Sequence, residues 1–264
     1  MGTRVIVEHA ASSLYVERGG NEGPLLLLIH GLASNGAVWD RLLPLVQRHW
    51  SGSYLIPDLR GHGKSPHTRP YSFGHFVTDL AGFVERGRKV AVIGHSLGGV
   101  LGALLASGWF GVDVRTVLAL SVKTVWTDEE LVKFEGVGNQ EVRWMESQSD
   151  AAARYVKSSG LTGIVEAGER VVQRGITQQD GRYRFAADQL VYGSTGRNVG
   201  GIFREALCPV HFATGANDTM APVEQHLPYD ENAQVIHGAG HQVHLEEPDE
   251  IWRVFSAHWA KDEA

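Results

Sequence analysis

The sequence of 264 residues predicts an α/β fold: a doubly wound, mostly parallel sheet with an inserted helical cap. Apolar runs of strand length alternate with segments of helical periodicity, which is typical of a parallel sheet covered by helices. The run 25–29 is apolar without interruption, as expected of a strand buried on both faces. From about 124 to 205 no such run occurs, and roughly 80 residues are too many for a plain loop.

The part of the chain before this insertion supplies the first strands and helices. Two short strand-like runs, 5–7 and 14–17, indicate an opening hairpin or meander. Further strands are expected at 25–29, 53–57, 89–93 and 114–120. Apolar residues at helical spacing predict helices over 37–50, 73–86 and about 100–108.

The insertion and the end of the chain complete the expected order of elements. The helix-like segments of the insertion are 128–134, 141–145, 150–157 and 164–174. Two more strands and a closing amphipathic helix are expected at 208–214, 234–237 and 251–259. We therefore expect a core made of 1–122 and 206–264, with the cap, 123–205, lying over the carboxyl edge of the sheet.

Composition and charge are those of an ordinary globular protein, with 43% apolar and 20% charged residues. A net charge of −6 without a dense basic cluster argues against nucleic acid or an anionic membrane as a partner. Cys208 is the single cysteine, so no intrachain disulfide can form, and a cytoplasmic location is expected. Residues 1–10 do not resemble a signal peptide, and the apolar run 25–29 is too short to span a bilayer.

A candidate nucleophile follows the strand 89–93. Gly94, Ser96 and Gly98 form a Gly-x-Ser-x-Gly pattern between this strand and the next helix. Such a turn exposes the serine hydroxyl, and the small residues two positions before and after it let neighbouring segments approach closely. We therefore predict that Ser96 is the nucleophile of a covalent mechanism.

A serine nucleophile needs a base and an acid that orients the base. Asp218 follows the strand 208–214, and His241 follows the strand 234–237, so both are expected at the same sheet edge as Ser96. Asp188 is the rival acid but does not follow a strand, and His244 is the rival base. His241 and His244 lack a third ligand at matching spacing, so no metal site is expected.

The negative oxygen of an acyl-transfer intermediate requires two backbone donors. The N–H of Leu97 at the start of the helix after Ser96 is one candidate. The loop after the strand 25–29 supplies the other, for which we choose the N–H of Leu32.

These elements together resemble the α/β-hydrolase fold superfamily. The matching motifs are His30-Gly31-Leu32, Asp58-Leu59-Arg60-Gly61-His62-Gly63-Lys64-Ser65, Gly94-His95-Ser96-Leu97-Gly98-Gly99, Gly215-Ala216-Asn217-Asp218, and Gly240-His241 followed by Glu247-Pro248. They occur in the order of the family and are specific for the fold rather than for the substrate. A serine at position 96 differs from the aspartate of haloalkane dehalogenases and epoxide hydrolases. The resemblance implies a small-molecule substrate and neither metal nor organic cofactor, and it leaves the oligomeric state open.

The expected activity is hydrolysis of an ester-like bond, an ester or a lactone, in a small and largely apolar substrate through an acyl-enzyme. Three alternatives stay open: a carbon–carbon bond hydrolase of a diketone-like substrate, a cofactor-free perhydrolase, and a low-turnover receptor that retains the triad. Aromatic and thioether side chains of the insertion are expected to line the pocket, for which we name Trp126, Trp144 and Met145.

Overall fold

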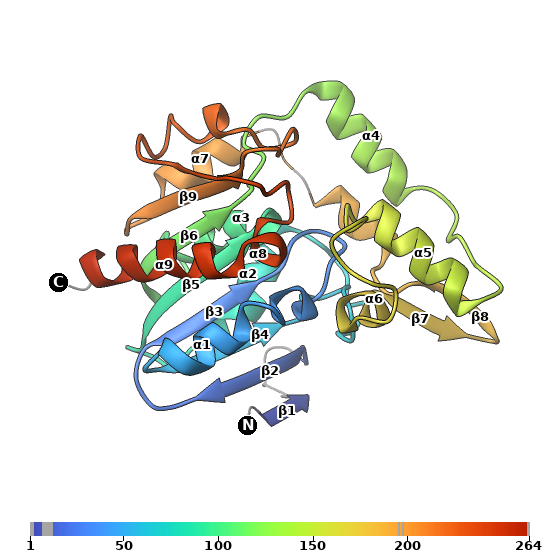
Figure 1. Ribbon diagram of the computed structural model, residues 1–264, viewed down its shortest axis with the longest axis horizontal. Coiled ribbons are helices and arrows are strands. Elements are labelled where there is room, and N and C mark those ends of the chain that lie inside the picture. The colour runs from blue at the N-terminus through green and yellow to red at the C-terminus, as the bar shows by residue number, and fades with distance from the viewer. Residues whose placement is uncertain (1–2, 7–12, 195, 197, 263–264) are drawn as a thin grey trace.

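The computed structural model describes residues 3–6, 13–194, 196 and 198–262 (Figure 1). Its eight-stranded sheet, counted over these residues, has the order β1-β2-β4-β3-β5-β6-β9-β10. The strands are β1 (Thr3–Ile6), β2 (Tyr15–Gly20), β3 (Leu25–Ile29), β4 (Ser53–Pro57), β5 (Lys89–His95), β6 (Asp113–Leu120), β9 (Val210–Gly215) and β10 (Gln234–Ile236). Pairing is antiparallel for β1–β2 and β2–β4 and parallel from β4 to β10. The predicted fold class is confirmed, while Val7 of the expected first strand lies outside the described residues.

The register of β3 and β5 decides where the candidate site forms. Leu25 pairs with Val90 and Ile29 with Gly94, so the two strands end side by side. The loop after β3 therefore begins next to the turn after β5. This places the two predicted oxyanion donors on neighbouring segments of the chain.

Side chains along β3 alternate between two hydrophobic cores, one on each face of the sheet, so both faces of the sheet are buried. Leu26 and Leu28 point to the core formed with α1 (Leu43–His49) and α9 (Pro248–Asp262). Leu25, Leu27 and Ile29 point to the core formed with α2 (Phe73–Ala81) and α3 (Leu97–Leu105). The remaining short helices of the core are η1 (Gly36–Trp39), η3 (Val223–Gln225) and α8 (Val243–Glu246). Among the described residues, we find no helix with the length and apolar character needed to cross a bilayer.

The helix predicted over 37–50 is in fact two helices, η1 and α1. The side chain of Asn35 accepts a hydrogen bond from the backbone N–H of Ala37 and caps η1. Pro44 then lies in the first turn of α1, where its missing N–H costs no hydrogen bond. The chain therefore starts a new helix at this point instead of extending the first one.

The insertion lies beyond one end of the sheet (Figure 1). Its elements are α4 (Asp128–Gly138), α5 (Gln148–Ser158), α6 (Arg170–Arg174), β7 (Ile176–Gln179), β8 (Arg182–Phe185), η2 (Gln189–Gly193) and α7 (Val199–Arg204). Thr127 and Glu130 form a capping box, which explains why α4 begins at Asp128.

The expectation of a purely helical cap was wrong. The segment 141–145 is not helical, 164–174 contains only α6, and β7 pairs with β8 as an antiparallel hairpin. Asp180 and Gly181 form its turn with φ of 50° and 81°. Most residues of these strands are polar and partly exposed, so they lack the apolar run that would have indicated a strand.

A buried ionic cluster connects α6 to the sheet. Arg174 Nε donates to Asp58 Oδ2 (2.7 Å), and Arg174 Nη1 donates to Glu17 Oε1 (2.5 Å). The second oxygen of Asp58 accepts a hydrogen bond from Gly36 N (2.7 Å). Since Asp58 is completely buried, these bonds replace the water that its charge would otherwise need.

Candidate active site

Ser96 stands at a strained turn between β5 and α3, with φ of 49° and ψ of −114°. Steric contacts explain the two glycines around it. A Cβ on Gly98 would lie 2.0 Å from the carbonyl oxygen of Ile29, and one on Gly94 would lie 2.2 Å from the carbonyl oxygen of Gly98. Only glycine fits at either position, so the Gly-x-Ser-x-Gly pattern is a packing requirement of this turn.

Asp218 and His241 form the central hydrogen bond of the site. His241 Nδ1 lies 2.9 Å from Asp218 Oδ2. The other carboxylate oxygen accepts hydrogen bonds from the backbone N–H of Met220 (2.9 Å) and Ala221 (3.0 Å). Burial by itself would raise the pKa of Asp218, but the hydrogen bond and charge of His241 and the N–H of Ala221 outweigh it and lower the pKa to about 2. The ionised carboxylate fixes the proton on Nδ1 and leaves Nε2 available as a base.

The rival acid and the rival base have structural partners of their own. Asp188 accepts a hydrogen bond from the hydroxyl of Tyr71 (2.8 Å) and caps η2. His244 is fully buried, and its ring packs between those of Trp39 (4.6 Å) and His95 (4.4 Å). Burial, together with the nearby charge of His241, lowers the pKa of His244 to about 3, so the ring is neutral. The part of the chain that the structure describes contains no cluster of three metal-ligating side chains.

Leu32 and Leu97, the predicted oxyanion donors, line the same cavity as Ser96. Leu97 is the first residue of α3, where an N–H group has no partner within the helix. Neither the N–H of Leu32 nor that of Leu97 is hydrogen-bonded to another described residue. Both groups are therefore free to donate to an oxygen next to Ser96.

His30 holds the loop that carries Leu32. Its Nδ1 donates to the carbonyl oxygen of Gly31 (2.7 Å), and its Nε2 accepts from the backbone N–H of Leu59 (3.0 Å). Complete burial lowers the pKa of His30 to about 3, so the neutral ring keeps these opposite donor and acceptor roles. The loop after β3 is thus fixed to Leu59, which lies in the loop after β4 at the same end of the sheet.

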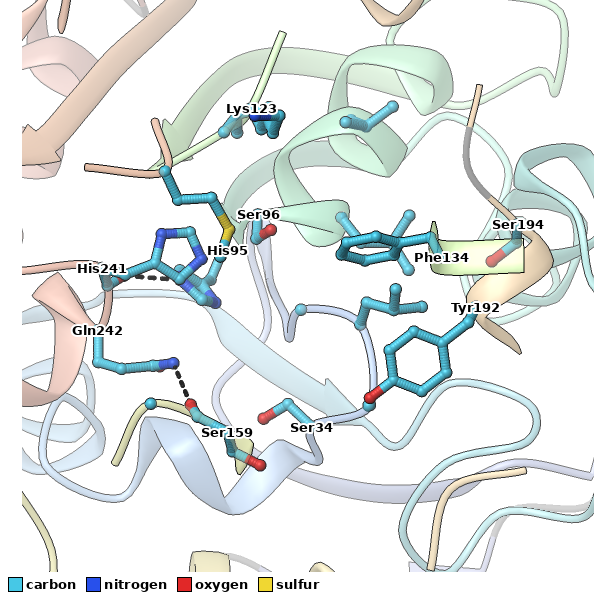
Figure 2. A pocket seen from close by; sticks show the side chains of 18 of the residues that line it. Ser34, His95, Ser96, Lys123, Phe134, Ser159, Tyr192, Ser194, His241 and Gln242 are labelled. Atoms are coloured by element: carbon cyan, nitrogen blue, oxygen red, sulfur yellow. Dashed lines mark hydrogen bonds between the residues drawn. The ribbon is translucent and has the colours of Figure 1, made fainter. Parts of the chain in front are cut away.

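Ser96 and His241 open into one cavity of about 370 Å³ (Figure 2). Its walls come from the loop after β3, from the strand ends and from the insertion. Trp126, predicted to contact substrate, lies in this wall, and its indole N–H donates to the carbonyl oxygen of Lys123 (3.2 Å).

The other two predicted substrate contacts, Trp144 and Met145, do not line the cavity, and their assignment is corrected. The ring of Trp144 packs against the guanidinium groups of Arg182 (5.0 Å) and Arg184 (5.8 Å) of β8. Met145 pairs with Tyr183 through two backbone hydrogen bonds of 2.8 Å, and its side chain is buried in the core. Their apolar character predicted that they pack against other residues, but it did not show whether they line the cavity or lie elsewhere in the insertion.

Several cavity residues carried no clear signal in the sequence. These are Tyr192, which forms an aromatic wall with Phe134, an aromatic residue of the insertion that was expected to contribute to the pocket, and Ser159 and Gln242, which form a polar wall (Figure 2). Gln242 follows the predicted base directly, which is the one clue to its place. The others come from segments of the insertion whose packing the sequence pattern does not define.

Comparison with curated proteins finds relatives named as hydrolases. Lipase LipV of Mycobacterium tuberculosis is 37% identical over 100 residues, which are 36% of this chain and 36% of that lipase. The 2-(acetamidomethylene)succinate hydrolase of Mesorhizobium japonicum is 26% identical over 252 residues, covering 88% of this chain and 86% of that protein. In the first three curated relatives, the match covers 31% to 55% of the relative's own length.

Solved structures resemble the whole chain. The thioesterase domain from the curacin biosynthetic pathway has a TM-score of 0.78 at 17% identity, covering 97% of this chain and 99% of that domain. The structure of E-2-(acetamidomethylene)succinate hydrolase has a TM-score of 0.78 at 22% identity, covering 97% and 98%. At such identities these two likenesses show the fold alone. The model of the alpha/beta hydrolase family, however, matches residues 26–254, and the chain therefore belongs to the alpha/beta hydrolase family.

Proposed function

We propose that this protein is a serine hydrolase that cleaves an ester-like bond of a small, largely apolar substrate through an acyl-enzyme. The observation that carries the proposal is the 2.9 Å hydrogen bond from His241 Nδ1 to Asp218, made at the cavity into which Ser96 opens. The two free N–H groups of Leu32 and Leu97 at the same cavity support it.

The proposed reaction has two halves. In the first, Ser96 Oγ attacks the substrate carbonyl carbon while His241 Nε2 takes the hydroxyl proton. The N–H groups of Leu32 and Leu97 stabilise the oxyanion, and His241 then gives the proton to the departing alcohol. In the second, His241 takes a proton from water, the resulting hydroxide attacks the acyl carbon, and Ser96 regains its proton as the carboxylic acid leaves. Asp218 stabilises the imidazolium in both halves.

The proposed substrate size and polarity follow from the cavity. A volume of about 370 Å³ suits a small ligand, and aromatic and aliphatic side chains form much of the wall. Lipase LipV, by its name, acts on lipids, which agrees with an apolar acyl group here.

The test is a stopped-flow measurement with p-nitrophenyl hexanoate combined with labelling by a fluorophosphonate. We expect turnover, labelling that maps to Ser96, and loss of both in Ser96→Ala. The matched control is Ser149→Ala, which removes an exposed hydroxyl of α5 that does not line the cavity. If the folded protein neither turns over a broad ester panel nor reacts with the probe, it is not a serine hydrolase.

A further inference from the structure

The cavity has two chemically different ends, and Ser96 lies between them (Figure 2). At one end, called here the polar end, Gln242 and Ser159 lie on the same side of Ser96 as His241. Ser34 lies beside this end, and its hydroxyl also faces the cavity. The opposite end carries aromatic rings.

This aromatic end is built from the insertion. Phe134 packs edge-to-face on Trp126 with 4.9 Å between ring centroids, and it contacts Tyr192 at 5.9 Å. All three line the cavity together with Phe73. Such a surface binds apolar groups by excluding water from them.

Gln242 has unused hydrogen-bonding groups at the polar end. Its side-chain Nε2 donates one hydrogen bond to the carbonyl oxygen of Ser159 (2.9 Å), which fixes the amide. Its Oε1 and its second N–H have no partner among the described residues. Gln242 is only 8% exposed but lines the cavity, so a ligand there can bind the amide groups that Ser159 leaves free.

The position of His241 decides which part of the substrate lies at which end. Because Nδ1 is bonded to Asp218, Nε2 is the atom that must give a proton to the leaving oxygen. The leaving group therefore lies on the His241 side of Ser96, which is the polar end. The acyl group must extend away from His241, toward the aromatic end.

Lys157, two residues before Ser159 in the chain, also lines the cavity and adds a charge preference. Lys157 of α5 is exposed at the cavity and has no carboxylate within ion-pair distance among the described residues. Lys123, the other cavity lysine, is already paired with Glu130 at 2.7 Å. Lys157 is thus the cation available to a bound substrate.

We propose that the substrate joins an apolar acyl group, bound at the aromatic end, to a polar leaving group that hydrogen-bonds to Gln242 and carries a negative charge near Lys157. This inference rests on the proposed function and names the substrate class for that site. It makes each end of the cavity responsible for one part of the substrate.

The experiment uses three hexanoate esters of similar size: those of glycolate, of glycolamide and of n-propanol. The first leaving group is anionic, the second polar and neutral, and the third apolar. Acetate esters of the same alcohols test the acyl side. Each kcat/KM is divided by the rate of hydroxide-catalysed hydrolysis, which removes differences in intrinsic reactivity. For the wild-type protein, we expect the normalised kcat/KM to decrease from the glycolate ester to the glycolamide ester to the propyl ester.

Three variants test the contributions of Gln242, Lys157 and Phe134 to substrate preference one at a time. Gln242→Leu should lower the glycolamide-to-propyl ratio about tenfold, the effect expected for loss of a buried hydrogen bond. Lys157→Met should lower the glycolate-to-glycolamide ratio about threefold, and less at high salt. Phe134→Ala should lower the hexanoate-to-acetate ratio about tenfold.

The matched controls are Gln178→Leu on the exposed side of β7, Lys133→Met on α4 and Trp144→Ala outside the cavity. They should leave all three ratios unchanged. Circular dichroism and the rate of phosphonate labelling at Ser96 establish that each variant is folded.

Two results would overturn the proposal. One is a reversed assignment, in which Gln242→Leu changes the acyl ratio and Phe134→Ala changes the leaving-group ratio. The other is a wild-type protein that hydrolyses the esters without preferring a polar leaving group; the proposed function would then stand without this inference. Absence of turnover and of Ser96 labelling would remove both.

Discussion

The side-chain Nε2 of His95 lies 2.9 Å from the backbone carbonyl oxygen of His241. A carbonyl can only accept, so Nε2 carries the proton and His95 is the donor. Burial, with the nearby His244 and His241, lowers the pKa of His95 well below its usual range, which keeps the ring neutral. The residue next to Ser96 thus holds the main chain of His241.

We expect His95→Ala to lower kcat, because the loop that carries His241 loses this support. A displacement of about 1 Å in a catalytic group costs ~10²-fold. His95→Gln should restore part of the loss, since its amide can donate to the same carbonyl. Steady-state kinetics with p-nitrophenyl hexanoate measure both variants. Equal losses in the two would assign His95 to packing alone.

Asp218→Asn should reduce kcat by ~10³-fold or more, because an amide at this position no longer holds His241 in the correct tautomer. The matched control is Asp188→Asn, which changes a carboxylate bonded to Tyr71 and η2 outside the cavity. We expect the control to retain most of its turnover. The reverse ranking in kcat would transfer the acid role to Asp188.

Acid should destabilise the fold through its buried histidines. Burial, the largest cause, lowers the pKa of His30, His62 and His244 from 6.5 to about 3. Between these values the unfolded chain binds more protons than the folded one, so the free energy of unfolding falls as pH falls. The contribution of these neutral histidines to stability is fully present above pH ~6.5. Below that pH, each histidine lowers the free energy of unfolding by ~1.4 kcal/mol per pH unit.

His244→Phe tests this linkage at one residue. Neither ring nitrogen of His244 has a hydrogen-bond partner among the described residues, so phenylalanine sacrifices no bond. The free energy of unfolding, measured by urea denaturation, should be similar to wild type at pH 8 and higher at pH 5. Parallel curves at all pH values would show that folding does not lower the pKa of His244.

Arg174→Met should destabilise the protein by about 3–5 kcal/mol, because it leaves the completely buried carboxylate of Asp58 without its cation. Arg253→Met is the control: Arg253 forms an exposed ion pair with Glu250 on α9, so its loss should change stability little. Urea denaturation at neutral pH compares the two. A loss as small in Arg174→Met as in the control would mean that water replaces the guanidinium.

The sheet and the candidate triad could be predicted because they depend on short-range patterns. Continuous apolar runs identified β3 and β4, and the residues just after the strands gave Ser96, Asp218 and His241. Parallel strands bring such residues to the carboxyl edge of the sheet, regardless of the length and conformation of the segments between the strands.

The interior of the insertion could not be predicted in the same way. Trp126 and Trp144 are the same residue type in similar surroundings in the sequence, yet one faces the cavity and the other packs under two arginines. The difference arises from the path of the chain between them. Gln242 was missed because a single polar residue has no periodicity from which its direction could be inferred.

The ion pairs of Arg174 have a consequence for attempts to exchange parts of this enzyme with its relatives. A graft of the complete insertion would remove Arg174 from Asp58 and Glu17 unless the donor supplied a guanidinium at the same place. A graft limited to α4 would instead cross the partly exposed ion pair of Lys123 with Glu130. The part suited to exchange is therefore α4, and a chimera that changes only this helix keeps the ion pairs of Arg174 while it replaces Phe134 in the cavity wall.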